Sequence, residues 1–395
     1  MNQLTKQHLI DPEICIRCHT CEEACTIGAI THDSVNVVVD PAKCNFCMDC
    51  IAPCPTGSID NWRVVAEPYG LEAQLGWSEL PAQADFSGDS NASAEALDDG
   101  IADLLAEAHA GAGGAAKAPV SAAKPTVNLF SSSAPAIATV QGNYRLTAET
   151  ADSDVRHIIL DLGTTAFPVL EGQTVGVLAP GTDSDGRPHR MRLYSISSPR
   201  DGERANTNNL SLTVKREAGG ICSNFLCDLA KGDRVQLAGP FGATFLMPDD
   251  AASDIVMIFT GTGSAPFRGF TMRRQRVAAM APGRMTLFFG ARSPDALPYF
   301  GPLGKVPERL LVKHFAFSRV AGAPKHYVQD QMREQAAALA EALMRPQTHI
   351  YICGLKAMEA GVEQAFEDIA RGGGATWKTI RDQMRDSGRY HVETY

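Results

Sequence analysis

Two closely spaced cysteine runs near the start of the chain have the residue type and spacing of an iron–sulfur protein. Eight of the eleven cysteines lie in these runs, at Cys15, Cys18, Cys21, Cys25, Cys44, Cys47, Cys50 and Cys54. Each run reads C-x2-C-x2-C-x3-C, and soft thiolates at this spacing are typical ligands of [4Fe–4S] clusters. The pattern therefore predicts two such clusters, and with them an electron-transfer function.

The fourth cysteine of each run is expected to serve the cluster of the other run. Three cysteines of a run can hold three iron corners, whereas the fourth lies too far along to close the same cluster easily. In two-cluster ferredoxins this cysteine crosses over. We therefore predict one cluster on Cys15, Cys18, Cys21 and Cys54, and the other on Cys44, Cys47, Cys50 and Cys25. The module departs from the pattern once, because Thr26 follows Cys25 where proline is expected, as at Pro55.

Disulfide bonds and structural zinc are the alternative explanations for so many cysteines. Residues Met1 to Pro12 contain neither the apolar stretch nor the small-residue cleavage site of a secretion signal, so disulfides are not favoured. Zinc sites usually take two pairs of ligands, which differs from the doubled four-cysteine run. We expect a protein of the reducing cytoplasm.

A second set of residues that could take part in chemistry lies in the middle of the chain, at Arg192, Tyr194 and Ser195. An arginine can neutralise a pyrophosphate, a tyrosine ring can stack on a planar cofactor, and a serine hydroxyl can bond a ring nitrogen. Further on, Gly219 and Gly220 precede Ile221, Cys222 and Ser223 and a predicted helix. Glycines let the backbone approach a ligand, and a helix N-terminus favours an anion. Either motif alone is weak, but together they indicate a flavin nucleotide site.

Residues 137–395 resemble the plant-type ferredoxin–NADP⁺ reductase family. Its flavin signature is matched by Arg192-x-Tyr194-Ser195, and its FAD-phosphate loop by the residues that begin at Gly220. The remaining matches are the glycine loop Gly261-Thr262-Gly263 with Pro266, the pair Cys353-Gly354, and the C-terminal Glu393 and Tyr395. The motifs stand in the family's order and cover about two-thirds of the chain.

The resemblance implies roles for individual residues. Tyr194 and Tyr395 would sandwich the flavin ring of FAD, and Ser195 would lie near flavin N5. Cys353 and Glu393 would line the nicotinamide pocket. Cys353 has the alternative of a buried structural thiol, and Glu393 that of a solvated charge near the C-terminus.

The loop after the predicted strand that ends at Phe317 indicates which coenzyme is used. A 2′-phosphate needs a cationic, hydrogen-bonding site, whereas NAD needs an acidic residue on its ribose. Residues that could supply such a site are Ser318, Arg319, Lys325, Tyr327 and Gln329, and no Asp or Glu lies among residues 315–329. NADPH is therefore expected, although isolated basic residues in a surface loop are often only solvated.

The elements that must position these residues divide the chain into four parts. Residues 1–65 are expected to form an α+β ferredoxin module, and residues 66–125 an acidic, Ala/Gly-rich tether with a helix between Ala94 and Ala110. Residues 126–249 show strands without long helices between them, which predicts an antiparallel β-barrel for FAD. Residues 250–395 alternate strand and helix, which predicts a doubly wound parallel α/β domain for NADP.

Composition excludes some partners. The formal net charge is −9 for 395 residues, which argues against nucleic acid. No apolar stretch approaches the roughly 18 residues of a membrane span, so no membrane association is expected. The oligomeric state is left open.

The arrangement of the whole chain resembles the NADPH-dependent reductase components of benzoyl-CoA 2,3-epoxidases. That resemblance implies a di-iron oxygenase partner and a place in aerobic benzoate breakdown. The alternative is a general NADPH–ferredoxin reductase with a built-in ferredoxin that serves another low-potential acceptor. A non-catalytic electron carrier with a degenerate flavin half is a third possibility, which the intact Arg192, Tyr194, Ser195 and Glu393 argue against.

Overall fold

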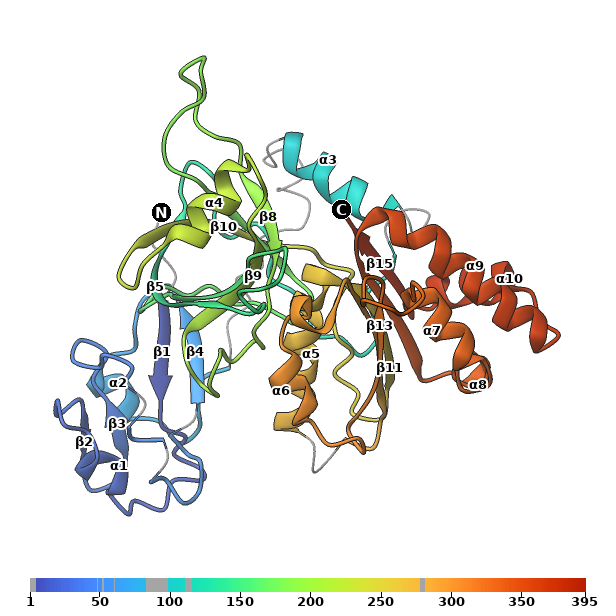
Figure 1. The fold of residues 1–395 in the computed structure, drawn as a ribbon. Coiled ribbons are helices and arrows are strands. Elements are labelled where there is room, and N and C mark those ends of the chain that lie inside the picture. The colour runs from blue at the N-terminus through green and yellow to red at the C-terminus, as the bar shows by residue number, and fades with distance from the viewer. Residues whose placement is uncertain are drawn as a thin grey trace.

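The protein is described by a computed structural model. It describes residues 5–47, 49–51, 53–59, 61–82, 99–110, 116–277 and 281–395. Figure 1 shows a small cluster module, a β-barrel beside it, and an α/β domain that carries the C-terminus. Within the described ranges, no helix combines the length and the apolar character that crossing a bilayer requires.

The cluster module is built from two antiparallel strand pairs. Strand β1 (Thr5–Leu9) pairs with β4 (Asn61–Val65), and β2 (Ile30–His32) pairs with β3 (Val37–Val39). The short helices α1 (Thr20–Glu23) and α2 (Leu71–Leu75) complete it. Its small core consists of apolar side chains packed directly against cysteines of both runs.

The module extends into the segment that the sequence suggests is a tether. The side chain of Gln74 in α2 bonds the backbone of Val39 in both directions, at 2.8 and 3.2 Å. The Asn36 side chain donates to the carbonyl oxygens of Leu75 and Trp77 at 3.0 and 2.7 Å. These contacts are polar, and so the hydrophobic pattern of the sequence gives no sign of them.

The barrel contains six antiparallel strands in the order β8-β7-β10-β5-β6-β9. They are β5 (Ala136–Arg145), β6 (Val155–Asp161), β7 (Thr174–Leu178), β8 (Arg192–Ser195), β9 (Asn209–Lys215) and β10 (Arg234–Phe241). A bridge between Ile196 and Leu212 joins the end of β8 to β9 and closes the ring. Helix α4 (Ile221–Asp228) packs on the barrel core, to which it contributes Cys222, Leu226 and Cys227.

The α/β domain has a five-stranded parallel sheet in the order β13-β12-β11-β14-β15. The strands are β11 (Asp254–Thr260), β12 (Met285–Ala291), β13 (Leu311–Phe317), β14 (Thr348–Gly354) and β15 (Tyr390–Thr394). The helices are α5 (Ser264–Arg276), α6 (Phe300–Gly304), α7 (Val328–Glu334), α8 (Ala336–Met344), α9 (Lys356–Gly372) and α10 (Trp377–Asp386), with 3₁₀ turns at Gly261–Gly263 and Pro294–Ala296. Alternate residues of the strands feed two apolar cores, one on each face of the sheet.

Helix α3 (Asp99–Ala108) lies in the middle of the tether region. The helix expected between Ala94 and Ala110 is found here, although residues 94–98 lie outside the described residues. In Figure 1 it lies above the junction of the barrel and the α/β domain, close to the C-terminus. Ile101, which is 6 % exposed, packs with Met191, Ala238 and Phe241 on the barrel. The helix therefore docks on the body of the protein.

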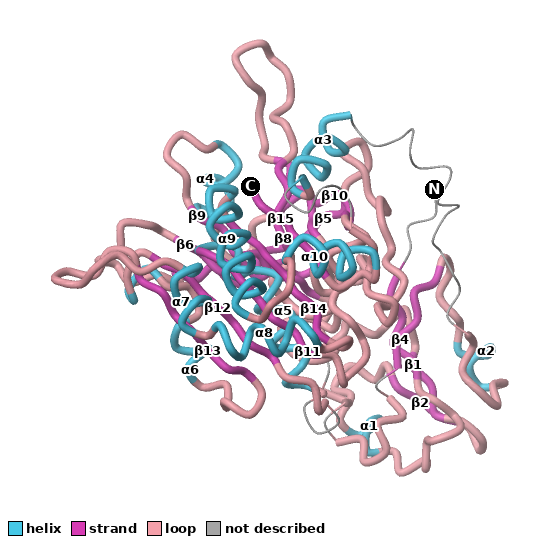
Figure 2. Tube along the Cα trace, turned by 90° about the vertical axis from the view of Figure 1, so that its right-hand side faces the viewer, coloured by secondary structure: helices cyan, strands magenta, loops and turns pink. Residues whose placement is uncertain are grey.

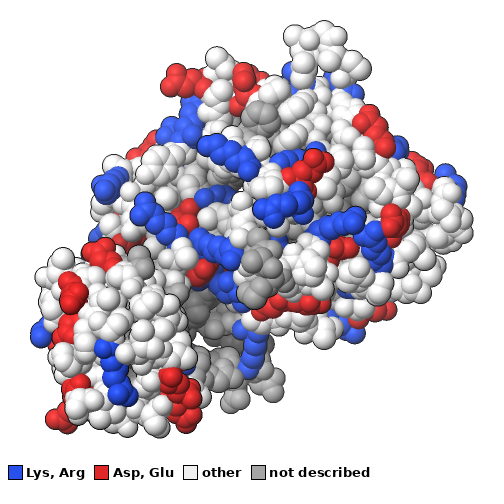
Figure 3. All heavy atoms as spheres, turned by 90° about the horizontal axis from the view of Figure 1, so that it is seen from below, with Lys and Arg blue, Asp and Glu red and all other residues white. Residues whose placement is uncertain are grey.

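The cluster module lies at the far end of the molecule from the C-terminus. The two perpendicular views in Figures 1 and 2 agree on this placement. The module contacts the barrel through a bridge between Thr5 and Thr165 and a 3.3 Å hydrogen bond from the Lys6 amide to the Thr164 carbonyl. On the face seen in Figure 3, basic and acidic side chains are interspersed over both the body and the cluster module.

A largely buried ionic cluster joins the barrel to the α/β domain. Arg268 of α5 binds the Glu203 carboxylate through two nitrogens, at 2.7 and 2.8 Å, and donates to the Ser197 carbonyl at 3.0 Å. His157 of β6 lies 3.2 Å from the same carboxylate. Burial opposes ionisation of Glu203, but the hydrogen bonds from His157 and Arg268 hold its pKa well below the usual range.

Replacing Glu203 with glutamine is expected to destabilise the protein by about 3 kcal/mol, because it leaves the Arg268 cation without its carboxylate in a mostly buried place. The folded-state pKa of Glu203 is depressed, so its contribution is complete at neutral pH. It is lost as the pH falls through the acidic range below the usual glutamate value. Chemical unfolding of wild type and variant at neutral and acidic pH measures both effects.

The matched control is Glu217→Gln, because Glu217 pairs with Lys215 on the surface, where both side chains are exposed. That change is expected to cost well under 1 kcal/mol. An equal loss in the two variants would show that the Glu203 cluster does not hold the two domains together.

Candidate functional site

The first three cysteines of the first run lie with the last cysteine of the second run. Burial raises the pKa of Cys21 to about 11, and the neighbouring Cys54 and Cys15 contribute to the rise. Although burial opposes it, hydrogen bonds from Ser58 and neighbouring groups lower the pKa of Cys54 to about 7. A thiol with such a pKa is about half ionised at neutral pH, and the thiolate is the form that binds metal.

The remaining four cysteines surround one cavity in the module. It is lined by Cys25, Cys44, Cys47 and Cys50, together with His8 and apolar side chains. Burial raises the pKa of the Cys44 thiol, and Cys47 and Cys25 add to the rise. Cys25 therefore lies with the second run, and none of the eight thiols forms a disulfide. Two groups of four thiols fit the donor set of [4Fe–4S] clusters.

The predicted flavin residues lie on β8, at the edge of the barrel sheet. Arg192 is exposed, and its side chain has no hydrogen bond or ion pair with any described residue. Tyr194 is half-buried against the barrel core, where burial raises its pKa and the Cys222 thiol raises it further. Ser195 pairs with Thr174 of β7. An unpartnered cation beside an aromatic ring fits a flavin nucleotide, whose phosphates and ring need these groups.

The glycine loop before α4 is held in a fixed shape. Gly219 has a φ of +74°, a conformation that side chains rarely adopt, and Gly220 is the N-cap of α4 without a side-chain cap. The Asn224 side chain donates to the carbonyl oxygens of Glu217 and Gly220 at 3.1 and 2.7 Å. The Ser223 hydroxyl donates to Gly220 at 3.3 Å. Uncapped amides at this helix start suit a phosphate group.

The second glycine loop packs tightly against β14. A Cβ on Gly263 would lie 2.3 Å from the Cys353 carbonyl oxygen, so this position accepts only glycine. The loop leads into α5, whose first turn carries Ser264 and Pro266 and has no side-chain cap. The Ser264 hydroxyl is buried and has no hydrogen-bond partner among the described residues. An orphaned hydroxyl at an uncapped helix start fits a coenzyme phosphate.

Cys353, Glu393 and Tyr395 come together at the carboxyl ends of β14 and β15. Cys353 pairs in register with Glu393, and the Tyr395 amide donates to the Gly354 carbonyl at 3.0 Å. The Tyr395 hydroxyl lies 2.7 Å from that of Thr262, while 58 % of the residue's surface is exposed. An aromatic residue at the end of a buried strand, with much of its surface exposed, is suited to stacking on a planar cofactor.

The predicted flavin residues on β8 and the predicted nicotinamide residues on β14 and β15 belong to different domains. No hydrogen bond or ion pair between described residues joins Ser195 to Glu393. The structure thus unites the residues of the nicotinamide loop with Cys353, Gly354 and Tyr395, and it places the β8 residues on the neighbouring domain. The roles predicted for these residues stay predictions.

The predicted 2′-phosphate residues form a loop between β13 and α7. Arg319 and Lys325 are exposed, and neither side chain has a hydrogen bond or ion pair within the described ranges. Tyr327 is 44 % exposed and is the N-cap of α7, where its amide donates to Asp330 at 3.0 Å. Gln329 lies close to Gly361 of α9, because a Cβ on that glycine would come within 2.9 Å of the Gln329 side chain. Two unpaired cations at the end of a parallel strand fit a phosphate.

One residue at the site was not predicted. His109, directly after α3, lies with its Nε2 3.3 Å from a Glu393 carboxylate oxygen. It is only 9 % exposed. The sequence carries no signal for this contact, since a single histidine in an Ala-rich segment has no partner nearby in the chain.

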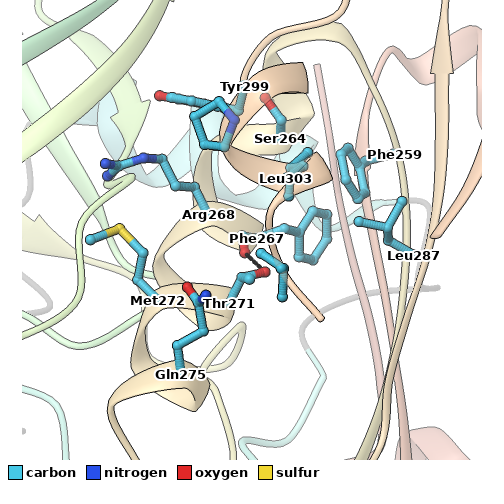
Figure 4. Close-up of a pocket in the computed structure, with 12 residues that line it drawn as sticks. Phe259, Ser264, Phe267, Arg268, Thr271, Met272, Gln275, Leu287, Tyr299 and Leu303 are labelled. Atoms are coloured by element: carbon cyan, nitrogen blue, oxygen red, sulfur yellow. Dashed lines mark hydrogen bonds between the residues drawn. The ribbon is translucent and has the colours of Figure 1, made fainter. Parts of the chain in front are cut away.

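A cavity of about 220 Å³ lies in the α/β domain between α5, α6 and the sheet, where Phe259, Phe267 and Leu287 form one wall (Figure 4). Two of its polar members, Arg268 and Tyr299, are already bonded, to Glu203 and Thr213 respectively. Ser264, whose hydroxyl has no partner among the described residues, also lines the cavity, which therefore reaches the start of α5 beside the second glycine loop. Most of its remaining lining is apolar.

Comparison with known proteins follows the same three-part division. Residues 14–58 match a 4Fe-4S dicluster domain, residues 146–245 an oxidoreductase FAD-binding domain, and residues 257–364 an oxidoreductase NAD-binding domain. These matches and the observed sheets confirm the predicted fold class.

Individual relatives agree with these matches. The chain is 39 % identical over 289 residues to the cyanelle ferredoxin–NADP reductase of Cyanophora paradoxa, which covers 68 % of this chain and 79 % of that protein. It is 35 % identical over 288 residues to the chloroplastic enzyme of Spinacia oleracea, covering 68 % and 78 %. The solved ferredoxin–NADP⁺ reductase of Plasmodium falciparum has the same fold, with a TM-score of 0.55 and 24 % identity over 68 % of this chain and 99 % of that one.

Proposed function

The chain belongs to the ferredoxin–NADP reductase family, and we propose that it oxidises NADPH and delivers single electrons through two [4Fe–4S] clusters to a partner oxygenase. Electron transfer of the ferredoxin–NADP reductase type, with FAD and NADP and a 4Fe-4S domain on the same chain, is shown by the matched domains and relatives. The observation that supports electron transfer through two clusters is the crossed grouping of the eight thiols. Cys54 lies beside the first run and Cys25 beside the second.

The protein's residues bind and orient the flavin. Arg192 supplies a free positive charge for the pyrophosphate, and the uncapped start of α4 at Gly220 supplies amides for the same group. Tyr194 and Tyr395 present aromatic faces, and Ser195 presents a hydroxyl for the ring edge. FAD, when bound, converts the two-electron chemistry of a nicotinamide into single-electron steps.

The nicotinamide side of the site is formed by the glycine loop and the ends of β14 and β15. Thr262, Gly263, Pro266 and Gly354 shape the backbone there, and Ser264 offers an unsatisfied hydroxyl. Cys353 and Glu393 line the place where the ring would lie, and burial raises the pKa of both. Because both residues are buried, this side of the ring would be shielded from water.

The charged loop after β13 supports NADPH rather than NADH. The resemblance to the family implies that the 2′-phosphate and the adenine would be held by Ser318, Arg319, Lys325 and Tyr327. Arg319 and Lys325 are available because their side chains form no ion pair within the described ranges. No acidic residue lies among residues 315–329 to bind a ribose in place of the phosphate.

Replacing Arg319 or Lys325 with alanine is expected to raise the KM for NADPH by about tenfold or more and to leave that for NADH nearly unchanged. A lost charge-assisted phosphate contact costs about 1.5–3 kcal/mol. Steady-state kinetics with both coenzymes measure the effect.

Arg309→Ala is the matched control, because this exposed arginine lies before β13, at the opposite end of the same strand. It should change neither KM. A wild-type protein that prefers NADH by kcat/KM would refute the assignment of this loop.

The partner we propose is the di-iron oxygenase of benzoyl-CoA 2,3-epoxidase, in aerobic benzoate degradation. The support is the resemblance of the whole arrangement, with a two-cluster module ahead of the reductase. The alternative is a general NADPH–ferredoxin reductase with a built-in ferredoxin that serves another low-potential acceptor.

An acceptor screen with anaerobically purified holoenzyme tests the proposal. NADPH should bleach the flavin, and iron and sulfide analysis should give about eight iron atoms per chain. Oxidation of NADPH should then be coupled to the di-iron oxygenase with benzoyl-CoA more efficiently than to free ferredoxins. Coupling only to general acceptors would favour the alternative, and an unbleached flavin would exclude both.

A further inference from the structure

The tether helix α3 is anchored at both domains that form the flavin site. Ile101 is buried in an apolar cluster with residues of β10 and the segment before β8, and Leu105 packs against the same cluster. Glu107 lies 3.7 Å from Lys356 at the start of α9. The end of α3 lies over β15, the strand that carries Glu393, and the exposed Glu107 ion pair adds little to holding it there.

His109 is held at this end by contacts with three different elements. Its Nδ1 lies 2.6 Å from the Leu105 carbonyl oxygen in α3. Its Nε2 lies 3.3 Å from the Glu393 carboxylate on β15 and 3.4 Å from the Thr244 hydroxyl in the loop after β10. His109 therefore joins the tether, the barrel and the α/β domain at one point.

These contacts restrict the protonation forms of the pair. A carbonyl oxygen can only accept, so Nδ1 of His109 carries a proton and donates to Leu105. The ion pair between Nε2 and the carboxylate is complete when His109 is a cation and Glu393 is ionised. The protonation of His109 and the charge of Glu393 therefore depend on each other.

The surroundings make Glu393 depend on His109. The side chains of Glu393 and His109 are only 8 % and 11 % exposed. Burial raises the pKa of Glu393, and His109 opposes this rise; the same contact raises the pKa of His109. The other titratable groups around the pair are Cys353, whose thiol is kept protonated by burial, and His391, whose pKa burial lowers to about 3.

We propose that His109 is a positioning residue of the nicotinamide pocket, which keeps Glu393 in place and ionised when the tether helix is docked. The inference rests on the proposed function, since it takes the Glu393 end of the sheet as the nicotinamide site. The ligand whose binding it controls is the oxidised, cationic nicotinamide ring, which an ionised carboxylate attracts and a protonated one does not. The neutral reduced ring is much less sensitive to this charge.

Docking of α3 therefore changes the ratio of the affinities for NADP⁺ and NADPH. The His109 contact stabilises docking while His109 is protonated, because its folded-state pKa is raised above the ordinary value. This contribution is complete below the ordinary histidine pKa and is lost as the pH rises through the raised value. An undocked helix would leave Glu393 without its cation.

The experiment compares His109→Gln and His109→Arg with wild type, as purified holoenzymes. Titration with NADP⁺ at a series of pH values should show binding about tenfold weaker for His109→Gln at neutral pH. Its NADPH-driven flavin reduction should show a pH profile displaced upward, because Glu393 is then protonated. His109→Arg, with a permanent charge, should keep NADP⁺ affinity and flatten the pH dependence.

Two further variants separate this role from a packing role. Ile101→Ser should loosen α3 and reproduce the His109→Gln pattern, with faster amide hydrogen exchange in residues 99–108. Glu107→Gln, which removes only an exposed ion pair, should resemble wild type. If His109→Gln and His109→Arg both lower thermal stability but leave the NADP⁺ to NADPH affinity ratio and the pH profile unchanged, His109 only packs the helix and the proposal is wrong.

Failure of the proposed function would look different. Wild-type flavin would then not be bleached by NADPH. The hydrogen exchange of α3 would still report whether His109 docks the helix.

Discussion

Replacing Cys25 with alanine is expected to abolish electron delivery to the acceptor while NADPH continues to reduce the flavin. Cys25 lines the same cavity as Cys44, Cys47 and Cys50, so its loss removes one of four ligands from the cluster of the second run. The cluster assigned to the first run keeps its four ligands, Cys15, Cys18, Cys21 and Cys54. Iron content should fall from about eight to about four atoms per chain.

Electron paramagnetic resonance of the reduced variant identifies which cluster is lost. Signals of the cluster assigned to the first run should remain. The matched control is Cys227→Ala, because this buried thiol belongs to the barrel core and lies outside both cysteine runs. Loss of the first run's cluster instead, or full iron content in the Cys25 variant, would refute the crossed ligand assignment.

Replacing Tyr395 with serine is expected to tighten NADP⁺ binding by about tenfold or more. If Tyr395 stacks on the flavin, it occupies the place that the nicotinamide ring must take for hydride transfer. Its displacement then makes the binding-competent state only fractionally populated, which weakens apparent affinity. The contacts permit such a movement: the Tyr395 amide is fixed to Gly354, whereas the ring is held by one hydroxyl contact with Thr262.

Titration of the oxidised holoenzyme with NADP⁺ measures this effect through the dissociation constant and a new long-wavelength charge-transfer band. Turnover should fall, because NADP⁺ leaves slowly. Tyr395→Phe is the matched control, since it keeps the ring and removes only the hydroxyl; it should bind NADP⁺ nearly as wild type does. An unchanged dissociation constant without the band in Tyr395→Ser would reject the displacement role, and a drop in melting temperature alone would indicate packing.

Much of the fold could be predicted from local sequence patterns. Runs of β-branched and apolar residues bounded by turn residues predict strands at Thr174–Leu178 and Leu311–Phe317, and β7 and β13 have these bounds. The apolar period predicts one helix over residues 327–343, but the structure has two helices there, α7 and α8, with a break at Gln335. Both halves face the same apolar core, so the hydrophobic period continues across the break and hides it.

Elements that depend on distant partners could not be predicted. Helix α10 is different, because Trp377, Ile380 and Met384 keep a helical spacing on its apolar side, which is a local signal that the sequence contains. Strand β15 mixes polar and apolar residues, yet all five are buried because β14 pairs with it and α3 lies nearby. The sequence pattern predicts a helix over residues 266–280. Helix α5 begins two residues earlier and ends at Arg276. Residues 278–280 lie outside the described residues.

The residues of the candidate site also fall into two groups, those with a local sequence signal and those that only the fold brings to the site. Cysteine spacing and the glycine loops are short-range signals that the sequence shows directly, and the ligand roles predicted from them stay predictions. His109 became visible only through the fold, because its contact with Glu393 spans most of the chain.

The pairing of β1 with β4 has a consequence for how such a protein can arise. Thr5 lies opposite Val65, so the polypeptide enters and leaves the strand pair at one point. A unit whose two ends are neighbours can be joined to another protein at one position without interrupting the hydrophobic core of either. The cluster module is in this sense a cassette, and related reductases could gain, lose or exchange it by gene fusion while the barrel and its coenzyme chemistry stay intact.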